Sequence, residues 1–211
     1  MSIVRDQFKR PGEVATVGMH LPHSASMRPV KGEVFIEVVD AASGEVLHKE
    51  HRQNVITLDA GILAAILFRD PASRDHGIYM LAVGTGASGA ILSPDAPDSR
   101  QRKLNAEIAR KAFSSTTFRD ASGNAVAIPT NVVDFTCTFD EGEAVGPLNE
   151  MGLISPISAN PASLSPNPDA YPNRDLTRDL TLYDILVNYL TFSVLSVPNT
   201  ARFSVTWRLT F

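Results

Sequence analysis

The chain has a single cysteine, Cys137, so it cannot form an intramolecular disulfide or a zinc site built on several cysteines. It has no apolar run of the roughly 18 residues that a membrane-spanning helix needs. Its opening sequence, MSIVRDQFKR, lacks the apolar stretch of a signal peptide. Basic residues are outnumbered, with 19 Lys and Arg against 23 Asp and Glu. We therefore expect a soluble protein made in the cytoplasm, without a membrane or nucleic-acid partner.

With 211 residues, 44% of them apolar, the chain is long enough for one well-filled core. Residues 1–31 contain three prolines and no lasting periodicity, which predicts an extended N-terminal arm. This arm is either a disordered tail or a segment that becomes ordered against a neighbouring subunit. Residues 155–173 contain five prolines and predict a surface or contact loop. The folded domain is then expected to span residues 32–211.

Several later segments have the patterns of β-strands. Residues 34–39 and 45–48 flank the turn sequence DAASG and predict a hairpin. Residues 78–83 are continuously apolar, as in a buried strand, and residues 132–139 alternate between apolar and polar positions. Residues 104–113 fit a strand or a short helix.

The clearest alternation is at the end of the chain. One face of residues 201–211 carries Phe203, Val205, Trp207, Leu209 and Phe211. Residues 189–197 are also rich in β-formers, and only residues 198–200 separate the two segments. This spacing predicts an antiparallel hairpin. Because Phe211 still follows the pattern, we expect it to be packed into the sheet.

Residues 58–68 predict a helix that Thr57 could cap, with Asp59 favourably placed in the first turn. Its apolar residues near one broad face are Leu58, Ile62, Ala65, Ile66 and Phe68. The segment is too short to cross a bilayer, so we expect a buried core helix. The predicted fold is mainly β, an antiparallel β-sandwich with one or two short helices and an extended N-terminal arm.

The sequence GTGASG at residues 84–89 matches the dinucleotide-binding pattern G-x-G-x-x-G and follows a predicted strand. Such a site needs a helix that opens at the glycines and holds the pyrophosphate at its N-terminus. Pro94 and Pro97 leave no room for this helix. We therefore interpret the segment as a glycine-rich turn and expect no cofactor.

Two histidine pairs, His20 with His23 and His48 with His51, have a spacing that could form a metal site. In an extended segment, however, residues three apart point to opposite faces, and neither pair has an obvious third ligand. We expect no metal ion. Cys137 falls among the apolar positions of its strand and is interpreted as a core residue instead of a nucleophile.

Two charged groups are also candidates for chemistry. The acidic group comprises Asp134, Asp140, Glu141 and Glu143. It lacks the Asp-rich ladder of a calcium loop, so a solvated turn is expected. The basic group comprises Arg102, Lys103, Arg110 and Lys111. Glu107 and apolar residues interrupt it, so we expect a charged surface face. We therefore predict no catalytic, cofactor-binding or metal-binding residues.

Several short motifs stand in a characteristic order along residues 32–211. They are Gly32-Glu33-Val34, Ala42–Val46, Gln53–Thr57, Leu81–Gly86, Leu104–Arg110, Phe135 with Phe139, Leu148–Ile154 and a final strand with Trp207. This order resembles a group of tailed-phage virion proteins of the tail-fibre, collar or baseplate-associated kind. The resemblance implies a structural role in an assembled particle and brings no catalytic residues. The arm 1–31 and the loop 155–173 depart from the shared pattern.

We therefore expect a structural component of a bacteriophage virion and not an enzyme. Its partners would be other virion proteins and further copies of itself in a homo-oligomer, contacted through residues 1–31 and 155–173. One alternative is a capsid decoration or cement protein. Another is a carbohydrate-binding or receptor-binding module, but its aromatics would have to be exposed, whereas Trp207 and Phe203 lie on a face predicted to be buried. A nucleotide-dependent enzyme using residues 84–89 is the remaining alternative.

Overall fold

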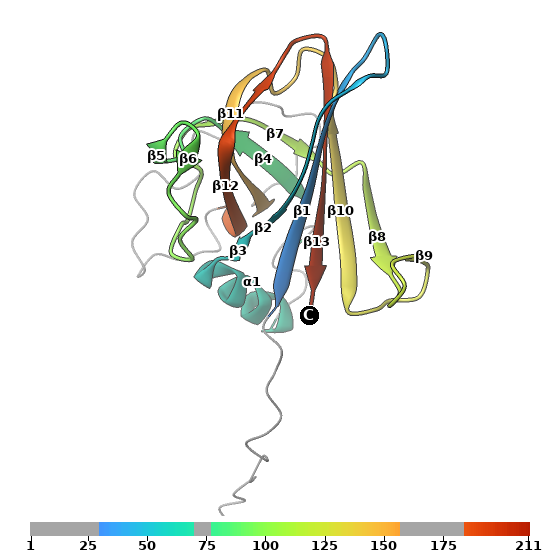
Figure 1. Ribbon diagram of the computed structural model, residues 1–211. Coiled ribbons are helices and arrows are strands. Elements are labelled where there is room, and N and C mark those ends of the chain that lie inside the picture. The colour runs from blue at the N-terminus through green and yellow to red at the C-terminus, as the bar shows by residue number, and fades with distance from the viewer. Residues whose placement is uncertain (1–29, 70–76, 157–183) are drawn as a thin grey trace, which may run out of the picture.

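The computed structural model describes residues 30–69, 77–156 and 184–211 (Figure 1). These residues form two antiparallel sheets packed against each other, with one helix at one end. The predicted antiparallel β-sandwich is confirmed. Residues 1–29 of the predicted arm, and all of the predicted loop after Pro156, lie outside the described residues.

The larger sheet has six strands in the order β2-β1-β13-β10-β8-β9. Their bounds are β1 Lys31–Asp40, β2 Val46–Gln53, β8 Ser115–Arg119, β9 Ala125–Val126, β10 Val132–Phe139 and β13 Ala201–Thr210. The predicted hairpin of β1 and β2 is present, with Phe35 opposite His51. The last strand, β13, lies in the middle of this sheet between β1 and β10.

The smaller sheet has five strands in the order β3-β12-β11-β4-β7. Their bounds are β3 Val55–Ile56, β4 Met80–Gly84, β7 Glu107–Ala112, β11 Gly146–Ser155 and β12 Ile185–Val197. Residues 104–113, which fitted a strand or a helix, thus contribute strand β7. A small pair, β5 (Gly89–Ala90) and β6 (Ser93–Pro94), belongs to a loop that lies beside β12. There the Val194 N–H donates to the Ile91 carbonyl at 3.1 Å.

The core lies between the two sheets. Strand β13 contributes every second side chain to it, each at most 2% exposed: Phe203, Val205, Trp207 and Leu209. The Phe139 ring of β10 stacks on Phe203, with ring centroids 5.8 Å apart. Cys137 is fully buried here, as predicted, and burial raises the pKa of its thiol to about 12. Burial thus disfavours the thiolate, which is the nucleophilic form of cysteine.

The predicted hairpin between the last two strands is wrong. Strand β12 pairs with β11 and β3, whereas β13 pairs with β1 and β10 in the other sheet. Residues 198–200 therefore carry the chain across the core, and neighbouring turns bind this link. The Gly142 N–H donates to the Asn199 carbonyl and the Ala41 N–H to the Thr200 carbonyl, both at 3.0 Å. The alternation identifies the apolar face of each strand. Two consecutive strands with apolar faces can either pair within one sheet or belong to two sheets that pack against each other across the core.

The expected packing of Phe211 is also wrong, because its side chain is 59% exposed. The strand ends at Thr210, which is opposite Lys31 on one side and Val132 on the other. These are the first residues of β1 and β10. Since both neighbouring strands begin there, no strand remains to cover the next side chain, although the Phe211 N–H still donates to the Asn131 carbonyl at 2.9 Å.

Helix α1 (Leu58–Arg69) begins as predicted. The Thr57 hydroxyl accepts from the Ala60 N–H at 3.3 Å and donates to the Leu186 carbonyl at 2.6 Å. Thr57 therefore caps the helix and also fastens its first turn to β12. Within the described residues, no helix is long and apolar enough to cross a membrane.

The expectation of a buried core helix is wrong. Leu63 is 3% exposed and faces the core, but Leu58 is 59% and Phe68 89% exposed. The sequence of α1 is apolar on nearly every side, so its pattern could not identify the buried face. The helix covers one end of the sandwich beside β12 (Figure 1). Apolar side chains on its other side are exposed to solvent.

Candidate functional site

The glycine-rich turn after β4 is held by a buried carboxylate that sequence reasoning missed. Glu150 of β11 is 0% exposed. Its oxygens accept hydrogen bonds from the N–H groups of Gly86 (3.0 Å), Asn105 (3.0 Å) and Ala106 (2.8 Å) and from the hydroxyl of Tyr189 (2.7 Å). Four donors satisfy the carboxylate without a cation, which is the requirement for burying it. Burial and the adjacent Glu150 raise the pKa of the Tyr189 hydroxyl.

The glycines of this turn are needed because two backbone segments touch. A Cβ on Gly84 would lie 2.5 Å from the Ala106 carbonyl oxygen, and one on Gly86 would lie 2.4 Å from the Ala106 nitrogen. The chain then continues into β5 and not into a helix. The G-x-G-x-x-G pattern therefore reflects close approach of two backbones, and the helix N-terminus that holds a pyrophosphate is not formed there.

This network, which we call the Glu150 node, joins three of the motifs that carried the family resemblance. Gly86 belongs to the motif Leu81–Gly86, Asn105 and Ala106 belong to Leu104–Arg110, and Glu150 belongs to Leu148–Ile154. The neighbouring Asn149 adds a fifth tie, since its Oδ1 accepts from the Ala87 N–H at 3.0 Å. The three motifs thus meet in the folded chain, and the hydrogen bonds of the Glu150 node stabilise this part of the fold.

The predicted basic face does not form at Arg110, which is 3% exposed. Its guanidinium donates to Glu107 through Nε (2.5 Å) and a terminal nitrogen (2.8 Å), and to Asp184 at 2.5 Å. Burial alone would lower the pKa of Arg110, but these two carboxylates raise it. Neighbouring Lys111 turns to Glu143, at 2.6 Å. Arg110 and Lys111 therefore belong to two different ion-pair networks, because successive strand residues point to opposite faces.

The acidic group is also divided. Asp140 and Glu141 are exposed, as expected for a solvated turn, but Asp134 is buried in the sheet. Asp134 is 2% exposed and accepts from Arg208 (2.7 and 3.0 Å) and Arg119 (2.8 Å) across the outer face of the larger sheet. Asp140 and Glu143 instead bind Lys111. Asp140 and Glu143 thus share one cation, Lys111, whereas Asp134 is neutralised separately by Arg208 and Arg119.

Asp134 makes stability depend on pH. Burial alone would raise its pKa, but hydrogen bonds from Arg208 and Arg119 lower it below the ordinary 3.8. The stabilisation is therefore present above the ordinary value and is lost as pH falls through the lower pKa of the folded state. We expect Asp134→Asn to cost about 1–3 kcal/mol at pH 7 and to flatten the loss of stability below pH ~4 in urea titrations. The exposed Glu141→Gln is the control, and an unchanged acid slope in Asp134→Asn would contradict this account.

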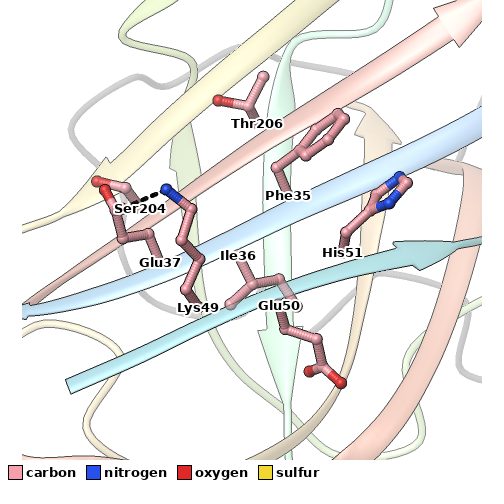
Figure 2. Close-up of a pocket in the computed structure, with 8 residues that line it drawn as sticks. All are labelled: Phe35, Ile36, Glu37, Lys49, Glu50, His51, Ser204 and Thr206. Carbon is pink, nitrogen blue, oxygen red and sulfur yellow. Dashed lines mark hydrogen bonds and ion pairs between the residues drawn. The ribbon is translucent and has the colours of Figure 1, made fainter. Parts of the chain in front are cut away.

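A shallow hollow of about 330 Å³ lies on the outer face of the larger sheet (Figure 2). The exposed ring of Phe35 lies beside it, with His51 stacked at 4.5 Å between ring centroids. The Arg208 guanidinium lies 5.5 Å from the Phe35 ring centroid and comes from β13, on the other side of β1 from His51. Both neighbouring strands thus place a side chain against Phe35. The ring offers little free face on which a sugar could stack.

The histidines of the pair His48 and His51 contact different partners. His48 contacts Glu50 at 3.4 Å, while His51 stacks on Phe35. Across residues 30–69, 77–156 and 184–211, no three His, Cys, Asp or Glu side chains are grouped so that they could hold a metal ion. His20 and His23 lie outside the described residues.

The end of the sandwich at α1 is different, because apolar side chains gather there in solvent. The exposed side of α1, here called the α1 face, consists of Leu58, Ile62, Ala65 and Phe68. Described residues that adjoin the two predicted contact segments lie near the start of α1. Gly32 accepts from the Asn54 N–H at 3.2 Å, and Ser155 pairs with Ile185 beside the strand residues that Thr57 binds.

No protein-family model matches this chain, and none of the curated proteins matches its sequence.

Proposed function

We propose that this chain is a structural component of a bacteriophage virion, associated with the tail, collar or baseplate, and that it acts through protein–protein contacts and not by catalysis. The observation that supports this most is the α1 face. Phe68 is 89% exposed there. An apolar surface that remains in water favours a partner that covers it.

The proposed partners are other virion proteins and further copies of this chain. Residues 1–31 and 155–173 are the proposed contact segments, because both are rich in proline and include or adjoin residues near the start of α1. Extended segments can bind a neighbouring chain through backbone hydrogen bonds. The proposed location is the mature particle, after synthesis in the host cytoplasm.

Removing residues 1–29 is expected to abolish incorporation into particles while leaving the sandwich folded. The cut is placed there because β1 begins at Lys31. Particles would be purified from cells carrying the encoding genome and assayed by mass spectrometry for the full-length chain and the shortened chain. Circular dichroism of the shortened chain is the folding control. Absence of the full-length chain from particles would refute the virion role, and normal incorporation of the shortened chain would refute the role of the arm.

The same particles distinguish the alternatives. Labelling that maps to the head would select a capsid decoration or cement protein. The carbohydrate-binding alternative has less support, since Trp207 and Phe203 are fully buried and Phe35 is flanked by His51 and Arg208.

A further inference from the structure

We propose that the α1 face is the docking site for residues 1–29 of a neighbouring copy of this chain. The inference rests on the proposed assembly role and adds to it the surface that receives the arm. Each copy would then donate one arm and offer one helix.

The α1 face forms one continuous stripe along the helix. Its residues are spaced by four, three and three positions, from Leu58 through Ile62 and Ala65 to Phe68, and therefore lie above one another on one side. Leu58, Ile62 and Phe68 are 59%, 40% and 89% exposed. The stripe thus presents side chains of a size that a partner can bury.

The stripe is firmly held, and its one charged neighbour is the exposed Arg69, which lies on the same side four positions after Ala65. The charged residues of the helix are Asp59, which is 2% exposed, and Arg69 in the last turn. Leu63 packs into the core on the opposite side, and Thr57 fastens the first turn to β12. A surface held in this way loses little conformational freedom when a segment binds to it.

The position and length of the arm make it a suitable occupant. Residues 1–29 join the described chain at Val30, and β1 starts beside α1 (Figure 1). A 29-residue segment can span up to about 100 Å when extended, whereas a 12-residue helix is about 18 Å long. The arm is therefore several times longer than the surface it would cover and can reach another copy.

The arm has apolar side chains along its whole length. They are Ile3, Val4, Phe8, Val14, Val17, Met19, Leu21 and Met27. When the arm binds a neighbouring copy instead of its own helix, each copy gives one arm and receives another. Such a head-to-tail contact closes into a ring when its rotation permits.

A mixing experiment tests the exchange directly. One variant lacks residues 1–29 but keeps the α1 face. The other keeps its arm but carries Ile62→Glu and Phe68→Glu. Light scattering behind a sizing column is expected to show an oligomer for the full chain and the monomer mass for each variant alone, near 22.8 kDa for the full-length one. Mixed together, the two variants should form a complex with one copy of each, because one supplies the arm and the other the face.

Ile128→Glu is the matched control. Ile128 is 77% exposed and lies outside α1, so this variant should keep the oligomer of the full chain. Circular dichroism and thermal unfolding establish that all variants are folded. A monomeric full chain, variants that do not associate on mixing, or equal dissociation by Ile128→Glu would each overturn the inference. If the full chain is nevertheless found in purified particles, the virion role stands and only the docking site is wrong.

Discussion

Glu150→Ala is expected to leave much of the protein unfolded at room temperature. The substitution removes a carboxylate that accepts hydrogen bonds from three backbone N–H groups and from the Tyr189 hydroxyl. Glu150 itself is 0% exposed. Each buried donor left unpaired costs about 1–3 kcal/mol. The combined loss of at least about 4 kcal/mol is a large share of the roughly 5–15 kcal/mol that stabilises a typical domain.

Urea unfolding followed by far-ultraviolet circular dichroism measures this loss. Tyr189→Phe is the matched control, because it removes only one donor and should cost about 1 kcal/mol. Glu150→Gln should fall between the two, since it keeps the shape and one acceptor oxygen but loses the charge. A cost below about 1 kcal/mol for Glu150→Ala would show that water or another group replaces the carboxylate.

The elements that the sequence predicted correctly are those set by local pattern. The alternation in β10 and β13 identified the buried rows, and the turn between β1 and β2 identified their pairing. The apolar pattern of a strand does not show which strand lies next to it. The short link between β12 and β13 therefore predicts a hairpin, although the two strands belong to different sheets. The prediction that α1 is buried is wrong for a related reason. A helix that is apolar on nearly every side can lie in the core, or it can cover the end of a sandwich with one side exposed.

The Glu150 node could not be predicted because its members are far apart in the chain. Glu150 is 39 positions from Tyr189 and 64 from Gly86. One signal of this contact is present in the sequence. The motifs Leu81–Gly86, Leu104–Arg110 and Leu148–Ile154 each contain a glycine or a polar residue that the local strand pattern does not require.

Arg110→Met is expected to destabilise the protein by about 3–5 kcal/mol. The guanidinium neutralises Glu107 and Asp184, and Asp184 is 1% exposed. Removing it leaves two carboxylates close together with little access to water. Methionine cannot donate a hydrogen bond in place of the guanidinium, and the pair is buried, so the loss is larger than that of an ordinary surface ion pair.

The cause can be separated from lost packing by removing the carboxylates as well. A triple variant with Arg110→Met, Glu107→Gln and Asp184→Asn should recover much of the lost stability, because it leaves no buried charge unpaired. Arg202→Met, at an exposed position of β13, is the control and should change stability by less than about 0.5 kcal/mol. If the triple variant is as unstable as Arg110→Met alone, the side chain of Arg110 acts by filling space between the strands, and the charge account of this site is wrong.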